Sequence, residues 1–419
     1  MLVGAWLFAA LGWWAFARPY TFFDLRIYHG AVTWWLNGHT LYEYAAPDSG
    51  LGFTYPPFAA LLMLPMAALP PVAAGVVSTV ASVAVFAWIM TVLVGPVADR
   101  MGWPRWVAIG AAIPLAGVTE PIRETLGFGQ VNVLLLGLLI ADVVGLRLTA
   151  AAEPPARFGS RAWWRQGGWA GAGVGLAAAV KLTPALFIVY FVLTRQWRAA
   201  RNALAAAALA TGVGALIAPT ESRDFFGSVL WQTGRVGFAD LTPNQSIGGI
   251  LARLYDTPDT PTLLWLTFSL LALALGLSRA GAAHRDGDEL AALALVGLAA
   301  NAISPISWSH HLVYVVPALV ILGDTALRRR TRRGVLRPWL RSVHWPYAVG
   351  AFALYLLFVV SPIWFAAHPL HQGVSHYADG AWGVLAENSL ALAVLALLAL
   401  LPWRAASIRD SSPTRRSRR

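Results

Sequence analysis

Blocks of apolar residues alternate with short polar segments along the whole chain. Many blocks are too long for the core helices of a soluble domain, and a helix that crosses a bilayer needs about 20 mostly apolar residues. The pattern predicts an all-α polytopic membrane protein, a bundle of about twelve transmembrane helices. The candidate spans are residues 2–17, 57–69, 72–94, 106–118, 131–148, 169–193, 203–218, 263–277, 290–303, 312–322, 347–363 and 390–401.

The composition agrees with a membrane protein. Of the 419 residues, 58% are hydrophobic and 12% are charged, and the mean hydropathy is +0.60. Soluble domains carry about 45–50% apolar and about 25% charged residues. The chain has no cysteine, which excludes a disulfide framework, a thiolate nucleophile and a cysteine-ligated zinc site.

The net charge of +11 is distributed as in a membrane protein rather than a nucleic-acid-binding one. All but one of the 31 basic residues are arginine, and many lie in clusters between apolar blocks. Such clusters mark the cytoplasmic side of spans. The basic segments at residues 328–341 and 404–419 therefore predict that both termini are cytoplasmic. The polar segments 18–55, 219–261 and 366–387 then lie outside, and the expected partner is the lipid bilayer, with no nucleic acid.

One part of the charge pattern conflicts with this topology. The same count places Arg157, Arg161 and Arg165 outside. Either residues 169–193 form a re-entrant pair hinged at Lys181-Leu182-Thr183-Pro184, or the charge rule is broken locally. Residues 1–407 are predicted to form one membrane domain and residues 408–419 a disordered basic tail. The first apolar stretch ends in small residues like a signal peptide, but without a basic start it is expected to remain as the first helix.

Asp24 is the first candidate for chemistry. It follows the first span in Phe23-Asp24-Leu25-Arg26-Ile27-Tyr28, an aromatic setting. Partial desolvation raises the pKa of a carboxylate and improves it as a general base. The alternative is an interfacial aspartate that caps a helix beginning at Leu25.

Short motifs continue in order after Asp24 and Tyr28. They are Leu41-Tyr42, Tyr55-Pro56-Pro57, Gly129-Gln130-Val131-Asn132, Lys181-Leu182-Thr183-Pro184, Asn244-Gln245-Ser246 and Ser304-Pro305-Ile306-Ser307-Trp308-Ser309-His310-His311. Each is unspecific alone. Together they resemble glycosyltransferase family 87, the polyprenyl-phosphate-mannose-dependent mannosyltransferases of actinobacteria, within the GT-C superfamily of membrane glycosyltransferases.

The resemblance implies a GT-C-type bundle with re-entrant or juxtamembrane helices in the first outer loop, in a bacterial plasma membrane. It implies an inverting enzyme with an active site on the extracytoplasmic side. Asp24 matches the family's catalytic base, which deprotonates an acceptor hydroxyl. That oxygen attacks a polyprenyl-phosphate-mannose donor and forms an α-mannoside on a glycolipid acceptor of the phosphatidylinositol mannoside or lipomannan type. No cofactor is implied, because the donor is itself a substrate with a good leaving group, and no divalent metal is indicated.

The leaving phosphate needs cationic or hydrogen-bonding partners. We expect contacts to the donor phosphate or sugar, and side chains that line the site, from His310, His311, Lys181, Arg26, Asn244, Gln245, Tyr28, Tyr55 and Trp308.

Each of these residues also has a structural interpretation. The two histidines can flank a span, Lys181 can snorkel to an interface, and Arg26 can anchor headgroups. Asn244-Gln245-Ser246 can cap a helix, and Gln130 and Asn132 can bridge helices. His368, His371 and His376 share an outer loop with Asp379, but nothing fixes their geometry and no metal site is predicted.

Other functions remain open at this stage. A transporter or flippase for a lipid-linked sugar would share the hydrophobicity and the aromatic outer loops. A transferase could also use another polyprenyl-phosphate sugar, such as arabinofuranose, and the sequence leaves a 1→2 and a 1→6 linkage equally open.

Overall fold

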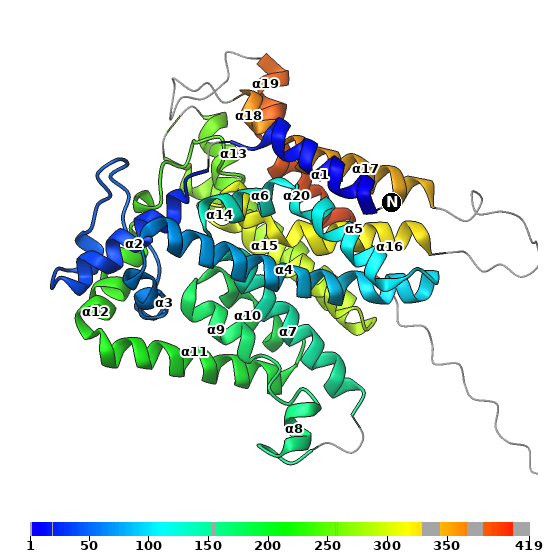
Figure 1. The fold of residues 1–419 in the computed structure, drawn as a ribbon, viewed down its shortest axis with the longest axis horizontal. Helices are drawn as coiled ribbons and strands as arrows, with labels where there is room; N and C mark the ends of the chain where they lie inside the picture. Colours follow the sequence, from blue (N-terminus) through cyan, green and yellow to red (C-terminus); the bar gives the residue numbers. More distant parts are fainter. Residues whose placement is uncertain are drawn as a thin grey trace, which may run out of the picture.

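The computed structural model describes residues 2–18, 20–152, 156–255, 257, 259–328, 344–366 and 380–404. Within these residues the regular structure is helical, and the β contact is an isolated bridge between Asn244 and Trp308 (Figure 1). The predicted tail and the boundary before it lie outside the described residues.

The first half of the chain contains α1 (Leu2–Phe16), α2 (Phe23–Leu36), η1 (Leu41–Glu43), α3 (Pro57–Met63), η2 (Leu64–Ala68), α4 (Pro71–Met101), α5 (Arg105–Gly117), α6 (Glu120–Phe128), α7 (Asn132–Ala150), α8 (Arg161–Arg165), α9 (Ala172–Val180), η3 (Thr183–Ala185), α10 (Leu186–Leu193) and α11 (Trp197–Ile217). The second half contains α12 (Pro219–Gly227), η4 (Val229–Trp231), η5 (Thr233–Arg235), α13 (Ile247–Leu254), α14 (Thr262–Arg285), α15 (Glu289–Ile303), η6 (Ser309–Tyr314), α16 (Val315–Leu327), α17 (Trp345–Val360), α18 (Ile363–Ala366), α19 (Gly380–Glu387) and α20 (Ser389–Leu400).

Six described helices are long and apolar enough to cross a membrane: α4, α7, α11, α14, η6 with α16, and α17 with its continuation to Phe365. The pair α19 and α20 is long and apolar enough only when taken together and is bent by 63°, as in a broken span or a re-entrant loop. Shorter apolar helices are α1, α3 with η2, α5, η3 with α10, and α15. The structure therefore confirms an all-helical membrane protein but not the twelve crossings expected from the sequence.

Residues 57–69, predicted as a span, turn back to the side from which they start. Tyr28 on α2 packs its ring 5.0 Å from that of Tyr55, just before α3. The next residue, His29, lies with its Nε2 2.9 Å from the carbonyl oxygen of Leu69, just after η2. Both ends of the segment thus lie beside neighbouring residues of α2, so the segment folds back on itself.

Residues 169–193 also reverse. A Cβ added at Gly171 would lie 2.1 Å from the oxygen of Ala199, and one at Gly175 would lie 2.2 Å from that of Ala203. Moving four residues forward, from Gly171 to Gly175, corresponds to moving four residues forward along α11, so α9 and α11 run parallel to each other. Because α10 ends at Leu193, just before α11 begins, it must run back between them. The segment is therefore a hairpin, as the re-entrant alternative expected, and its tip carries Lys181 and Pro184.

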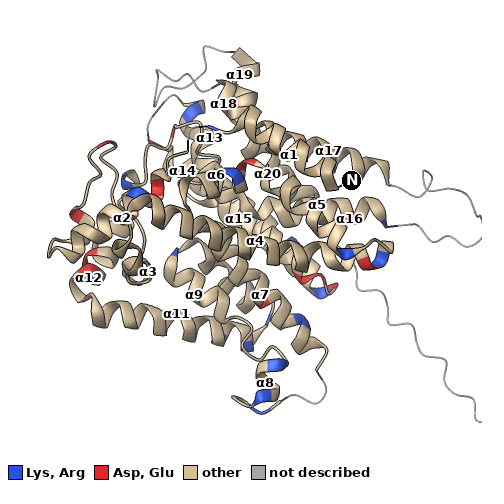
Figure 2. Cartoon of the chain, in the orientation of Figure 1, with Lys and Arg blue, Asp and Glu red and all other residues tan. Residues whose placement is uncertain are grey.

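The long helices connect two chemically different ends. Figure 2 shows charged positions gathered near helix ends and on α8, while the middles of the long helices carry few charges. The helix α7 begins with Asn132 at one end and has Arg147 in its last turn. Nineteen helical residues span about 28 Å. The helix α15, buried along nearly its whole length, lies at the centre.

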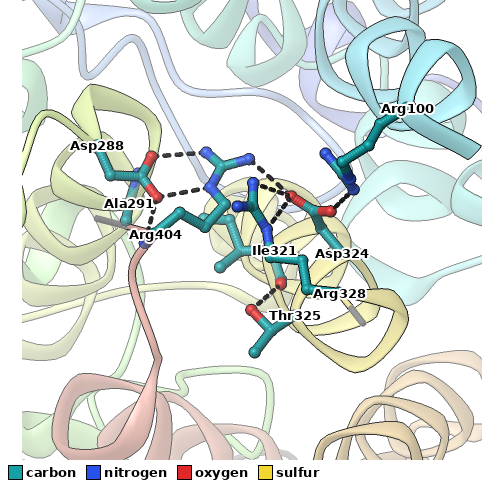
Figure 3. A network of polar contacts seen from close by, with 8 residues as sticks. All are labelled: Arg100, Asp288, Ala291, Ile321, Asp324, Thr325, Arg328 and Arg404. Carbon is teal, nitrogen blue, oxygen red and sulfur yellow. Dashed lines mark hydrogen bonds and ion pairs between the residues drawn. The ribbon is translucent and has the colours of Figure 1, made fainter. Parts of the chain in front are cut away.

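The arginine-rich end is closed by a network of ion pairs (Figure 3). Arg404, after α20, donates to both carboxylate oxygens of Asp288, each at 2.6 Å, and to Asp324 at 3.2 Å. Asp324 also pairs with Arg100 of α4 and with Arg328, the latter at 3.2 Å. The side chain of Asp324 is fully buried. The network therefore joins the ends of α4, α16 and α20 to the start of α15.

We expect Asp324→Asn to lower the free energy of unfolding by about 3–5 kcal/mol, because it leaves three arginines without their shared buried carboxylate. Asp99→Asn is the matched control, since the pair between Asp99 and Arg105 is more than half exposed and such pairs contribute about 1 kcal/mol or less. Thermal unfolding of the purified protein in detergent measures both. Equal midpoints for the two variants would contradict this role of the network.

Candidate active site

Asp24 lies in the first turn of α2, held in place by the segment before it. Phe22 has a left-handed backbone with φ of 54° and caps α2. Its N–H donates to the carbonyl of Gly127 at 3.1 Å, and its ring packs so closely on Gly75 that an added Cβ would lie 2.4 Å from it. Since α2 begins at Phe23, Asp24 is not the cap that the alternative interpretation expected.

The side chain of Gln130 orients Asp24. Its Nε2 donates to Oδ2 of Asp24 at 2.7 Å and lies 3.2 Å from the hydroxyl of Tyr28. Its Oε1 accepts from the hydroxyl of Tyr55 at 2.8 Å. The structure thus brings together three residues expected at the site, and Gln130, expected only to bridge helices, connects them.

Lys181 reaches the same site from the tip of the α9–α10 hairpin. Its Nζ donates to Oδ1 of Asn132 at 3.0 Å and lies 5.5 Å from the ring centre of Tyr55. Nδ2 of Asn132 donates to the carbonyl of His310 at 3.0 Å. The lysine therefore lies inside the protein and does not snorkel to an interface.

Burial raises the pKa of Asp24 to about 6. The hydrogen bond from Gln130 and the positive charge of Lys181 oppose this shift, and the negative charge of Glu124 adds to it. A carboxylate with a pKa just below neutral is ionised at pH 7 and is still basic enough to accept a proton from a hydroxyl group.

A small polar pocket opens beside Lys181. Its lining is mostly amides, hydroxyl groups and apolar side chains, with one ammonium and one imidazole group. The lining residues are Asn132, Leu135, Lys181, Thr183, Pro184, Asn301, Ser304, Ser307, His311, Val313 and Tyr314. Such a lining suits a neutral polyhydroxylated group beside an anion.

The two histidines have different surroundings. His311 lines the pocket, and its Nδ1 accepts the backbone N–H of Trp308 at 3.2 Å. A neutral ring with Nδ1 as acceptor carries its proton on Nε2, so His311 has a donor for a ligand. His310 is buried with its ring 5.7 Å from that of Phe128. Trp308 itself is half-buried beside them.

Arg26, Asn244 and Gln245 are not brought to this pocket. Arg26 is exposed on α2. Asn244 and Gln245 are fully buried. Nε2 of Gln245 donates to the carbonyls of Thr242 and Glu387 at 2.7 and 2.6 Å, and its Oε1 accepts the N–H of Ala391 at 2.8 Å.

Asn244 holds the neighbouring loop in the same way. Its Oδ1 accepts the N–H of Ser307 at 2.9 Å, and its Nδ2 donates to the carbonyl of Ala239 at 2.8 Å. The cap expected in this motif is present, because Oγ of Ser246 accepts the N–H of Gly249 at 3.0 Å at the start of α13. Through the bond from Asn244 to Ser307, the motif holds in place the segment that leads to His311.

An ionic cluster on α6 was missed from the sequence. Arg18 donates to both oxygens of Glu124 at 2.9 and 2.8 Å, and Tyr20 donates to Glu124 at 2.7 Å. Arg123 pairs with Glu120 at 2.5 Å, and both side chains are fully buried. Two acids and an arginine within Glu120-Pro-Ile-Arg-Glu124, between two apolar blocks, are the signal that was available. The candidate metal ligands at 368, 371, 376 and 379 lie outside the described residues.

Comparison with known proteins identifies the family of this chain. The model of glycosyltransferase family 87 matches residues 53–305. A relative from Mycobacterium tuberculosis is 36% identical over 345 residues, covering 78% of this chain and 77% of its own length. This chain belongs to glycosyltransferase family 87. The family predicted from the motifs, and with it a membrane glycosyltransferase, is confirmed.

That family-87 relative is named a polyprenol-phosphate-mannose-dependent alpha-(1-2)-phosphatidylinositol mannoside mannosyltransferase. Another, from the same species, is named for a phosphatidylinositol pentamannoside acceptor and is 31% identical over 94% of this chain and 84% of its own. Among solved structures, ArnT from Cupriavidus metallidurans bound to undecaprenyl phosphate is similar with a TM-score of 0.45 and 18% identity, covering 95% of this chain and 72% of that one.

We expect Gln245→Leu to lower the free energy of unfolding by about 2–4 kcal/mol, because it removes three buried hydrogen bonds, to the carbonyls of Thr242 and Glu387 and from the N–H of Ala391. The folded fraction should keep its transferase activity, since Gln245 is not at the pocket. Gln232→Leu is the control, because Gln232 is exposed and bonds one nearby hydroxyl. Thermal unfolding and activity per folded molecule are the measurements. Normal stability with lost activity would instead return Gln245 to the site.

Proposed function

We propose that this chain is an inverting α-mannosyltransferase that moves mannose from polyprenyl-phosphate-mannose to a phosphatidylinositol mannoside at the extracytoplasmic face. The names of the relatives support the donor, the acceptor and a 1→2 linkage. The observation that carries the proposal is an oriented carboxylate with a raised pKa, Asp24, together with the half-buried Lys181 beside a polar pocket.

Asp24 supplies the base. Gln130 holds Oδ2, and Oδ1 has no hydrogen-bond partner among the residues that the structure describes. The acceptor hydroxyl loses its proton to Oδ1 as its oxygen attacks the anomeric carbon of the donor. The bond from that carbon to the phosphate oxygen breaks, and polyprenyl phosphate leaves. Attack from the face opposite the phosphate inverts the anomeric centre.

Lys181 and His311 stabilise the leaving phosphate. Lys181 uses one N–H for Asn132 and has two more, and His311 has its Nε2–H. Both line the same pocket. Charge that develops on the phosphate oxygen is stabilised there without an acid, because a phosphate monoester is a good leaving group.

The arginines support an extracytoplasmic site. Most of the arginines that the structure describes lie at the end of the helix bundle opposite Asp24 or on the loops that join helices at that end. They are Arg100, Arg105, Arg147, Arg157, Arg161, Arg165, Arg195, Arg198, Arg201, Arg279, Arg285, Arg328 and Arg404. With α9–α10 and α3–η2 as re-entrant pairs, the GT-C-type bundle has ten crossings: α1, α4, α5, α7, α11, α14, α15, α16, α17 and α20. Both termini are then cytoplasmic, and the charge conflict at Arg157 to Arg165 disappears.

The deciding experiment measures transfer by the purified protein from synthetic polyprenyl-phosphate-mannose to a phosphatidylinositol mannoside. Asp24→Asn should fold normally and lose about 10²- to 10⁴-fold in rate, the range contributed by a general base. Asp48→Asn, an exposed aspartate of the same outer loop, should retain activity. Activity of Asp24→Asn near that of wild type would remove Asp24 as the base. Binding of the donor by wild type without transfer would favour the flippase alternative.

The pH dependence follows from the pKa of Asp24. Only the carboxylate accepts a proton, so kcat/KM should fall about tenfold per pH unit below an apparent pKa near 6. Stability should change in the opposite direction, because an acid with a raised pKa contributes less to folding as it ionises between its ordinary value and about 6. Asp24→Asn should therefore unfold no earlier than wild type at pH 7. A flat pH profile from 5 to 8 would exclude Asp24 as the titrating group.

A further inference from the structure

Three buried polar atoms without hydrogen-bond partners lie within one short segment next to the pocket. They are Oδ1 of Asn301, Oγ of Ser309 and Nε2 of His310. This holds for the part of the chain that the structure describes. Buried polar atoms are nearly always paired, so an unpaired one that faces a pocket indicates that a ligand supplies the partner. Of the three residues, Asn301 lines the pocket.

The orientation of the Asn301 amide is fixed by its neighbours. Nδ2 donates to the carbonyl oxygen of His311 at 3.2 Å and to Oγ of Ser307 at 3.3 Å. A carbonyl oxygen only accepts, so rotating the amide by half a turn would place two oxygens against each other. The nitrogen must face His311, and Oδ1 is left as an acceptor that no described protein group uses.

The position of Asn301 makes this acceptor rigid. It lies in the last turn of α15, the central buried helix, and is only 2% exposed. Around the pocket, the ammonium group of Lys181 and the imidazole of His311 are donors. An amide oxygen beside them cannot pair with a phosphate oxygen, because both accept. It can accept only from a donor such as a sugar hydroxyl.

We propose that Oδ1 of Asn301 accepts a hydrogen bond from one hydroxyl of the donor's hexosyl group and so determines which sugar is transferred. This inference rests on the proposed function, because it takes the lipid-linked hexose as the occupant of the pocket. Lys181 and His311 bind the phosphate, and Asn301 binds the sugar that is attached to it. A sugar that lacks this hydroxyl, or carries it in the opposite orientation, leaves Oδ1 buried and unpaired.

The test uses a series of polyprenyl-phosphate-mannose donors, each lacking one hydroxyl. With wild type, removing one particular hydroxyl should lower kcat/KM by about 10- to 100-fold more than removing the others, because a site built to bond a hydroxyl rejects the analogue without it. With Asn301→Ala, that selective loss should disappear, and the intact donor and this deoxy donor should react at similar rates.

The control is Asn202→Ala. Like Asn301, Asn202 donates two hydrogen bonds from its amide, here to the carbonyls of Gly168 and Ala170 at 2.8 and 2.9 Å, but it lies by the far end of α9. It should affect all donors equally and keep the wild-type selectivity. If Asn301→Ala also slowed all donors equally and kept the wild-type selectivity, Asn301 would have a purely structural role and the inference would be wrong.

Two further outcomes keep the inference separate from the proposed function. If Asn301→Ala does not fold, the wild-type series alone decides, because equal losses for every deoxy donor exclude a selective acceptor. If wild type transfers mannose but Asn301→Ala keeps the wild-type selectivity, the inference is wrong and the function stands. If wild type transfers from no mannosyl donor, the proposed function itself fails.

Discussion

The side-chain amide of Gln130 is the interaction on which the site depends. It joins Asp24 and Tyr28 on α2 to Tyr55 before α3, all from the turn between α6 and α7. That turn needs Gly129, which has φ of +70° and lies so close to Leu25 that a Cβ would come within 2.7 Å of its side chain. The glycine therefore lets the turn approach α2, and the amide of Gln130 then fixes the carboxylate of Asp24.

The re-entrant hairpin follows from the need to satisfy polar groups within the membrane. Non-helical backbone is tolerated at membrane depth only where protein surrounds it. At the start of α9, Asp142 accepts the N–H groups of Gly173 and Val174 at 3.2 and 2.7 Å. At its other end, Lys181 lies at the C-cap. A carboxylate at the N-terminus and a cation at the C-terminus both match the helix dipole, so Lys181 also stabilises the hairpin.

Hydropathy predicted the class of protein, and Lys181 was found because it is the chain's one lysine. Hydropathy did not show where the chain reverses within an apolar block. A hairpin such as residues 169–193 has the composition of one straight span, and only packing against α11 shows the reversal. Gln245 could not be assigned either, since one of its carbonyl partners belongs to Glu387, 142 residues away. Asn301 was missed because it ends an apolar helix and looks like an ordinary helix-bridging amide.

The two ends of the bundle are coupled by the helices that they share. The helix α15 starts beside the Asp288–Arg404 pair and carries Asn301 in its last turn, and η6 with α16 carries His311 in its first turn and Asp324 in its last. Both helices are buried along most of their length, and close-packed interiors transmit displacement. A shift of Arg404 or Asp324 would therefore move the pocket wall, whose contacts must hold within about 0.5 Å for chemistry. The ion pairs at the arginine-rich end thus contribute to the geometry of a site that they never contact.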